Sequence, residues 1–217
     1  MQLPLAIITI LPLAAASPLL PSILRSLFLR DLNSTTQNDL VDGSPCKELT
    51  VIFARGTDSP GNVGSSTGPP FFEAIAALIG TDNIAVQGLD YPATIIGFLE
   101  GGDTAGGTLM ANLTTRAMTQ CPDTKVVVSG YSQGGQEVHM AAKQLSPAVA
   151  AQVSSVVIFG DPDNGTAVGT IDPSKVLIIC HSDDYICKGS IIVDADHLNY
   201  ANDAGTAAAF VVKAAGL

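Results

Sequence analysis

The sequence predicts a single-domain α/β fold, a three-layer sandwich in which helices cover both faces of a central, mainly parallel five-stranded sheet. Three observations support this fold class. Short apolar segments rich in β-branched residues alternate along the chain with segments of helical pattern, as in parallel sheets covered on both sides. A Gly-x-Ser-x-Gly sequence at residues 130–134 stands between one such strand and one such helix. At 217 residues and 47% hydrophobic content, the chain suits one domain with a sizeable core.

The expected strands are short and mostly apolar, as buried parallel strands should be. They are Leu49–Ala54, Ile84–Gly88, Lys125–Ser129, Ser155–Phe159 and Lys175–Ile179. The expected helices are Phe71–Ile79, Thr104–Thr119, Gly134–Leu145 and Asn202–Ala215. Residues 56–70 are rich in Gly, Ser and Pro and should form a loop. The sequence contains no internal repeat and no long linker that would indicate a second domain.

The N-terminal region is typical of an exported protein. Residues 1–16 contain no charged side chain, carry an apolar run and end in three alanines, which fits a signal peptide. We interpret residues 17–45 as a candidate propeptide or second apolar segment followed by a loose, polar N-terminal arm. The catalytic domain is expected at 46–217. Glycosylation sequons, whose occupancy the sequence leaves open, begin at Asn33, Asn112 and Asn164.

The segment around Ser132 carries the strongest chemical signal. The strand ending at Ser129 leads into Gly130 and Ser132, and a helix follows Gly134. In a nucleophile elbow, a strained turn presents the Ser hydroxyl at the tip of a strand, and flanking glycines keep Cβ atoms out of the turn. The helix N-terminus then directs N–H groups at a developing oxyanion. We therefore expect an α/β-hydrolase-like fold with Ser132 as a nucleophile.

A serine nucleophile needs a base, and the chain has three histidines. His139 is expected on the solvated side of its helix, opposite the apolar face. His181 lies inside a short loop bounded by cysteines, which gives it little reach. His197 precedes the last helix and follows the serine and a candidate Asp, which is the chain order of α/β-hydrolases. His197 is therefore the preferred base.

The acid that orients the base should lie at the carboxyl edge of the sheet, where sites form in open α/β folds. Asp183 and Asp184 follow the last strand, and the pattern of residues does not choose between them. Weaker candidates near another strand end are Asp161, Asp163 and Asp172.

Four motifs occur in a fixed order along the chain. They are Phe53-Ala54-Arg55-Gly56-Thr57, Gly130-Tyr131-Ser132-Gln133-Gly134, Asp184-Tyr185-Ile186-Cys187-Lys188-Gly189-Ser190 and His197-Leu198-Asn199-Tyr200. With the four cysteines, they resemble the cutinases, secreted serine esterases of the α/β-hydrolase class. The resemblance covers roughly Cys46 to the C-terminus and is more specific than any one motif.

The resemblance implies a role for each matching residue. Ser132 would be the nucleophile, His197 the base and Asp184 the orienting acid. The oxyanion hole would come from the N–H of Gln133 and from Thr57, through its N–H and its hydroxyl. The family often has Ser where Thr57 stands, a departure that keeps the hydroxyl.

The residues before His197 depart from the family pattern. The family commonly has small residues and Pro there, whereas Asp194 and Asp196 occupy this stretch. Their effect on the pH profile is left open by the sequence.

The four cysteines allow three pairings. We pair Cys46 with Cys121 and Cys180 with Cys187, as the resemblance also implies. Their spacing matches no zinc pattern, so no metal site is expected, and the chemistry implied by the resemblance needs no cofactor.

Charge and length limit the partners. The net charge of −10 argues against nucleic acid or an anionic membrane surface as a partner, while esters are uncharged and remain suitable substrates. We expect a secreted monomer without a stable membrane anchor. No amphipathic segment is long enough for a lid, which favours an open crevice. Its apolar rim is expected from Tyr91, Ile95, Ile96, Ile192, Val193 and Leu198.

The expected function is hydrolysis of cutin-type polyesters and short- to medium-chain esters through an acyl-enzyme. The alternatives are an acetylxylan esterase, a small lidless lipase and, in a different class, a non-catalytic secreted binding protein. Acyl-chain profiling would separate the enzymes, and labelling by an organophosphonate would separate all three from a binding protein.

Overall fold

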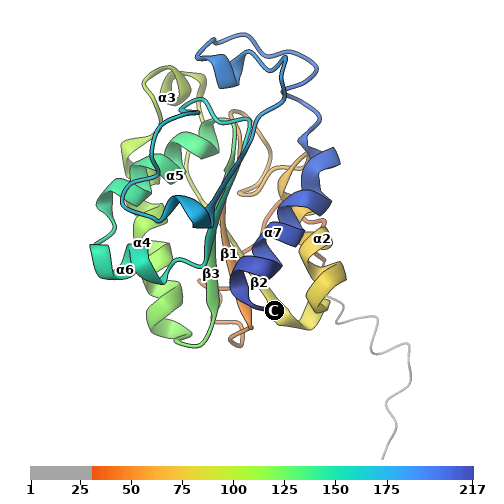
Figure 1. Cartoon of the computed structure of the whole chain (residues 1–217), viewed down its shortest axis with the longest axis vertical. Helices are drawn as coiled ribbons and strands as arrows, with labels where there is room; N and C mark the ends of the chain where they lie inside the picture. The colour runs from red at the N-terminus through yellow and green to blue at the C-terminus, as the bar shows by residue number, and fades with distance from the viewer. Residues whose placement is uncertain (1–30) are drawn as a thin grey trace, which may run out of the picture. The chain divides into compact units, whose positions relative to one another are not determined.

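A five-stranded sheet with strand order β2-β1-β3-β4-β5 forms the centre of the molecule (Figure 1). The structure is a computed structural model that describes residues 31–217, so the expected signal peptide and the candidate propeptide lie outside the described residues. The strands are β1 (Leu49–Ala54), β2 (Ile84–Gly88), β3 (Lys125–Tyr131), β4 (Ser155–Phe159) and β5 (Val176–Ile179). Each neighbouring pair is parallel, so the sheet, predicted to be mainly parallel, is parallel throughout.

Helices cover both faces of this sheet (Figure 1). Helices α2 (Gly68–Ile79) and α7 (Ala204–Ala215) pack together on one face, and α4 (Thr104–Gln120) and α5 (Gln133–Gln144) pack together on the other. The shorter helical elements are α3 (Ile95–Leu99), α6 (Pro147–Gln152), η1 (Thr81–Asn83), η2 (Pro173–Lys175), η3 (Ile186–Lys188) and η4 (Tyr200–Asp203). Among residues 31–217, no helix combines the length and apolar character needed to cross a bilayer.

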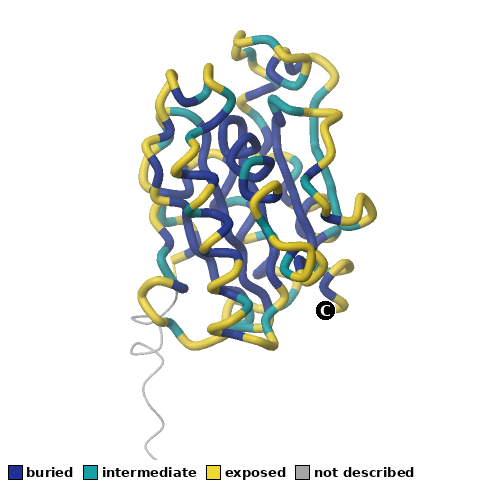
Figure 2. The backbone as a smooth tube through the Cα atoms, turned by 90° about the vertical axis from the view of Figure 1, so that its left-hand side faces the viewer, coloured by how far each residue is buried: buried dark blue, intermediate teal, exposed yellow. Residues whose placement is uncertain are grey.

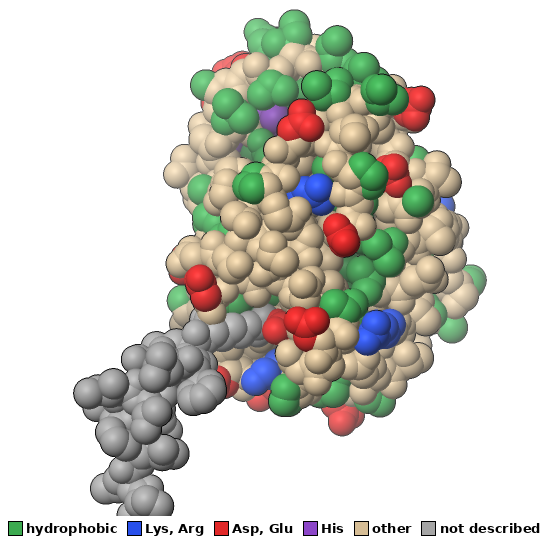
Figure 3. Space-filling model, turned by 180° about the vertical axis from the view of Figure 1, so that it is seen from behind, with side chains coloured by type: hydrophobic (Ala, Val, Ile, Leu, Met, Phe, Trp, Pro, Cys, Tyr) green, Lys and Arg blue, Asp and Glu red, His purple; other side chains and the backbone are tan. Residues whose placement is uncertain are grey.

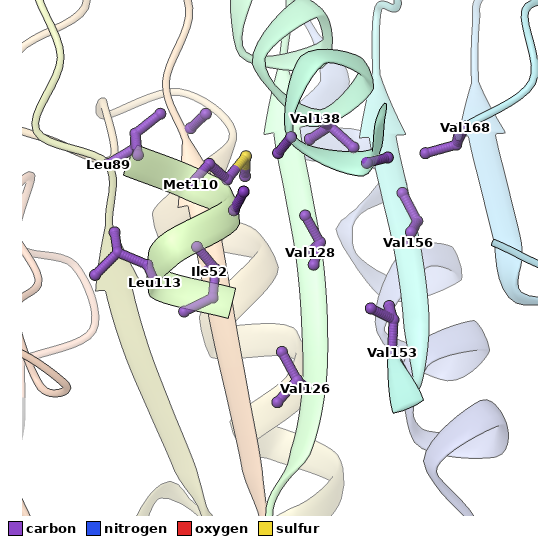
Figure 4. Packing of buried hydrophobic residues seen from close by; sticks show 14 of the residues in the cluster. Ile52, Leu89, Met110, Leu113, Val126, Val128, Val138, Val153, Val156 and Val168 are labelled. Atoms are coloured by element: carbon purple, nitrogen blue, oxygen red, sulfur yellow. The ribbon is translucent and has the colours of Figure 1, made fainter. Parts of the chain in front are cut away.

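Alternation along the strands divides the core into two apolar layers. Phe53 and Phe159 point toward α2 and α7, and their neighbours Ile52 and Ile158 point toward α4 and α5. Figure 4 shows the second layer, where Met110 of α4 lies over the sheet. The inner strands are almost wholly buried (Figure 2), whereas β5 is half-buried at the edge. Burial on both faces explains why these strands are continuous apolar runs.

Residues 31–45 are not the loose arm that their polar composition predicted. Leu32 and Leu40 are each only 5% exposed, and Asn38 forms an antiparallel bridge with Gln87 of β2. Asp39 adds two hydrogen bonds to Val86, one through its backbone N–H and one through its carboxylate. The segment covers the free edge of β2, which would otherwise present unpaired backbone groups.

Two disulfides connect the four cysteines. Cys46 is bonded to Cys121 across a sequence separation of 75, and Cys180 is bonded to Cys187 across a separation of 7. This is the predicted pairing. The short bridge closes the loop after β5 that contains Asp184.

Candidate active site

Ser132 occupies a strained turn between β3 and α5. Its φ of 56° and ψ of −124° lie in a region that non-glycine residues rarely adopt. The turn is close-packed, because a Cβ at Gly130 would collide with the carbonyl oxygen of Gly134, and one at Gly134 would collide with that of Ala54. The backbone N–H of Ser132 donates to the carbonyl of Phe159 at 2.9 Å. This is the geometry of a nucleophile elbow.

The structure brings Ser132, His197 and Asp184 into one hydrogen-bonded chain. Ser132 Oγ lies 2.9 Å from His197 Nε2, and His197 Nδ1 lies 2.8 Å from Asp184 Oδ2. The three residues are 8%, 1% and 0% exposed, respectively. Asp183, the other candidate acid on this loop, is exposed. The structure therefore separates two aspartates that the residue pattern could not distinguish.

Two tyrosines hydrogen-bond to Asp184 and His197 and fix their positions. The Tyr200 hydroxyl donates to Asp184 Oδ2 at 2.6 Å, and the Tyr131 hydroxyl donates to the His197 carbonyl at 2.8 Å. Burial and then the nearby Asp184 carboxylate raise the pKa of Tyr131 to about 12. Burial and the hydrogen bond to Asp184 also raise the pKa of Tyr200. Both hydroxyls therefore remain protonated donors at neutral pH.

Asp194 ties the loop that carries Asp184 to the loop that carries His197. One carboxylate oxygen accepts the N–H of Tyr185 at 3.0 Å, and the other accepts the N–H of His197 at 2.9 Å. The hydrogen bond from Tyr185, supported by the one from His197, lowers the pKa of Asp194. The sequence showed this departure from the family pattern but not that its carboxylate bridges the two loops.

The two expected oxyanion-hole residues lie side by side. Thr57 Oγ1 is 3.0 Å from Gln133 Oε1. Gln133 is the first residue of α5, where backbone N–H groups have no acceptor within the helix. The buried Gln133 Nε2 has no hydrogen-bond partner among the described residues.

An apolar crevice of about 370 Å³ opens beside Ser132. Its lining is Thr57, Ser59, Ser66, Ile95, Phe98, Tyr131, Ser132, Ile186, Ile191, Val193, His197 and Leu198. At the end of the molecule that carries α3 and the loop after β5, hydrophobic side chains gather on the surface (Figure 3). The crevice therefore lies within an apolar end of the molecule.

Only part of the expected rim lines this crevice. Ile95, Val193 and Leu198 do, whereas Ile96 and Ile192 are exposed beside it without lining it. Tyr91 was wrongly placed on the rim: it is 4% exposed, and its hydroxyl donates to the Arg55 carbonyl. Two exposed or half-buried apolar contributors were missed, Phe98 in the short helix α3 and Ile191. Ile191 directly precedes the Ile192-Val193 pair included in the rim, so its hydrophobicity was an available signal.

The expectation that His139 is solvated is also wrong. His139 is 0% exposed, and its Nε2 lies 2.9 Å from Asp161 Oδ2. Helix α5 packs against both the sheet and α4, so it is buried on more sides than one apolar stripe suggests. Asp161 therefore pairs with His139, whereas the acid that contacts His197 is Asp184. His181 lies outside the hydrogen-bonded chain of Ser132, His197 and Asp184 and contacts Asp203 instead.

Within residues 31–217, no group of three or more His, Cys, Asp or Glu side chains is arranged to hold a metal ion. The hydrogen-bonded Ser132, His197 and Asp184 can supply a nucleophile, a base and an orienting acid without one.

Comparisons with known proteins agree with this geometry. The cutinase family model matches residues 45–215. A cutinase of Botryotinia fuckeliana is 50% identical over 177 residues, covering 82% of this chain and 88% of that protein. The solved Trichoderma reesei cutinase in complex with a phosphonate inhibitor is 44% identical, with a TM-score of 0.79 and coverage of 89% of this chain and 84% of that one.

A solved acetylxylan esterase is more distant. It is 23% identical, with a TM-score of 0.66 and coverage of 79% of this chain and 100% of that one. This likeness shows a shared fold alone. The family model and the high identity to cutinases over most of the chain show that the chain belongs to the cutinase family and is a serine esterase that hydrolyses carboxylic esters.

Proposed function

We propose that Ser132 is the nucleophile, His197 the general base and Asp184 the acid that orients it. The observation that carries this assignment is the continuous chain from Ser132 Oγ through both ring nitrogens of His197 to Asp184. Because a carboxylate only accepts hydrogen bonds, it favours the tautomer in which Nδ1 carries the proton. Nε2 is then free to accept the Ser132 proton.

Hydrolysis proceeds in two halves. His197 Nε2 takes the Ser132 proton as Oγ bonds to the ester carbonyl carbon, and that proton passes to the leaving alcohol as the ester C–O bond breaks. Water then attacks the acyl-enzyme and gives a proton to His197. The acid leaves as Ser132 Oγ regains the proton, and the Asp184 carboxylate stabilises the imidazolium in both halves.

The oxyanion would be held by the N–H groups of Gln133 and Thr57 and by the Thr57 hydroxyl. In the observed arrangement, that hydroxyl donates to Gln133 Oε1, which competes with donation to substrate. A 180° rotation of the Gln133 amide would let the unpartnered Nε2 donate to Thr57 Oγ1 instead. The Thr57 proton would then be available to the oxyanion.

The proposed substrates are cutin-type polyesters and short- to medium-chain alkyl esters. The crevice is lined mainly by alkyl and aromatic groups, including Ile95, Phe98 and Ile191, and burial of alkyl chains against such groups is favourable. Ile95 and Ile191 are 58% and 68% exposed, so a polymer chain can approach them from solvent. Because the chain shares its fold with an acetylxylan esterase, hydrolysis of acetylated xylan is the second candidate activity.

The decisive experiment is Ser132→Ala with a matched control. Ser129 lies on β3, the strand that leads to Ser132; it is buried, and its hydroxyl has no partner among the described residues. Ser132→Ala should lose at least about 10⁴-fold in turnover and all labelling by an organophosphonate, while Ser129→Ala keeps both. A folded Ser132→Ala protein with near-wild-type turnover would overturn the assignment.

A substrate panel separates the candidate activities. It comprises p-nitrophenyl esters from acetate to palmitate, an insoluble polyester, acetylated xylan and an emulsified oil. Polyester hydrolysis with best turnover on short to medium chains supports the proposal. Preference for acetylated xylan indicates the carbohydrate esterase, and activation at an oil interface indicates a lipase.

We further propose that the protein is exported as a monomer, with residues 1–16 as signal peptide and 46–217 as the catalytic domain. Two disulfides within residues 31–217 suit an oxidising compartment. Intact-mass and N-terminal sequencing of the secreted protein, with its sedimentation behaviour, test these points.

A further inference from the structure

His181 contacts two groups that can only accept hydrogen bonds. Its Nδ1 lies 2.7 Å from the carbonyl oxygen of Asp196, and its Nε2 lies 2.8 Å from Oδ2 of Asp203. A neutral imidazole has one N–H and can donate to only one of them. Both contacts are satisfied together when each ring nitrogen carries a proton, which makes His181 an imidazolium.

The surroundings of His181 favour that charge. Asp196, in the loop before His197, and Asp203, at the end of η4, face it, and the ring stacks on Tyr200 with centroids 4.2 Å apart at 17°. Desolvation lowers the pKa of His181, but the hydrogen bonds to Asp196 and Asp203 outweigh it, so the net pKa is raised. The side chain is 23% exposed and can exchange its proton with solvent.

His181 is hydrogen-bonded to Asp184 and to the residue that precedes His197. Asp196, whose carbonyl it holds, directly precedes His197. On the other side, the backbone N–H of His181 donates to the Tyr200 hydroxyl at 3.1 Å, and that hydroxyl donates to Asp184 Oδ2. The His181 carbonyl also accepts the N–H of Asp184 at 3.2 Å.

We propose that protonated His181 is a positioning residue that holds the loop bearing His197 in register with Asp184, so that turnover falls when His181 loses its proton. This rests on the proposed roles of His197 and Asp184. On deprotonation, one acceptor must be released, either the Asp196 carbonyl or the Asp203 carboxylate. Release of either loosens the segment between β5 and α7 that carries the base.

The direction of the pH effect follows from the raised pKa. The positioning contacts are present below the pKa of folded His181 and are lost as pH rises through it. A general base must be neutral to act, which gives kcat an acidic limb. The second ionisation, of His181, should produce an alkaline limb.

The test measures kcat and KM from about pH 5 to about pH 10 for three variants and the wild type. Asp203→Asn removes the anionic partner that favours protonated His181, and its amide N–H can donate to Nε2 of the neutral ring, so both contacts can persist after deprotonation. The alkaline limb should therefore weaken or disappear, with KM little changed. His181→Gln should abolish the limb and lower kcat on the order of 10- to 100-fold at neutral pH, the scale expected when a catalytic group is slightly misplaced. Asp183→Asn makes the same charge change as Asp203→Asn, at an exposed site two residues after His181, and should leave the limb in place.

An NMR titration of the three histidine rings gives an independent readout, with His181→Gln identifying the signal. The His181 ring should titrate above the ordinary histidine range and together with the alkaline limb. An ordinary or depressed value, or an alkaline limb unmoved by both Asp203→Asn and His181→Gln, would overturn the proposal. Labelling of Ser132 by an organophosphonate in every variant shows that the nucleophile is still reactive. Failure of the catalytic assignment would show differently, as activity that persists in Ser132→Ala.

Discussion

Replacing the buried Glu137 by Gln should stabilise the protein at neutral and alkaline pH. Glu137 lies in α5 and is 0% exposed. Oε1 accepts the N–H of Asp103 at 2.7 Å, and Oε2 has no hydrogen-bond partner within residues 31–217. Burial raises the pKa of Glu137 from 4.5 to about 7, with the hydrogen bond from Asp103 opposing the shift.

The magnitude follows from the two pKa values. Between pH 4.5 and about 7, folded Glu137 keeps a proton that the unfolded chain releases. The free energy of unfolding therefore falls as pH rises through this window and levels off above it. Because each pH unit in the window is worth about 1.4 kcal/mol, the total fall is about 3 kcal/mol. Glutamine has the shape of the protonated acid but cannot ionise, so Glu137→Gln removes this fall.

Chemical denaturation of wild type, Glu137→Gln and Glu100→Gln at about pH 5 and about pH 8 provides the assay. The advantage of Glu137→Gln over wild type should grow between the two pH values, to at most about 3 kcal/mol. Glu100 is exposed at the end of α3, so Glu100→Gln should show no such growth. A constant difference between Glu137→Gln and wild type at both pH values would refute the claim that folded Glu137 retains a proton near neutrality.

Three further predictions concern the proposed machinery. Thr57→Ala should lower turnover by about 10²- to 10³-fold while Thr57→Ser stays near wild type; equal small effects on kcat would show that the hydroxyl is not a donor. Asp184→Asn should lower kcat by up to about 10⁴-fold, against a mild effect of Asp183→Asn; the reverse order would transfer the orienting role. Replacing Cys180 and Cys187 by Ser should lower kcat while lowering the melting temperature less than loss of the Cys46–Cys121 bridge does. The bridge of separation 7 removes less unfolded-state entropy than the bridge of separation 75. An unchanged kcat would exclude a positioning role.

The sheet was predictable because each inner strand is buried on both faces. Three expected strands, among them Leu49–Ala54 and Ser155–Phe159, match to the residue. Helices α3 and α6 were missed because segments of five and six residues are too short to show a periodic apolar face.

The errors in side-chain environment have a common cause. The position of His139 on its helix gave no sign of Asp161, a partner 22 residues away, and Tyr91 is aromatic whether it faces a crevice or Arg55. The candidate site was predictable where local motifs fix it, as around Ser132. The contacts of Asp194 and His181 depend on two loops meeting in space, which no local pattern encodes.

The edge position of β5 has a consequence for how long the enzyme works. The proposed nucleophile follows β3, which has β1 and β4 on either side. The proposed acid and base lie beyond half-buried β5, which pairs with β4 alone. Edge segments of this kind open locally at lower free energy than the inner strands. Amide hydrogen exchange should therefore be faster over residues 176–199 than over β3. On warming, heat inactivation should precede the loss of secondary structure and, where the opened segment recloses, should be reversible on cooling.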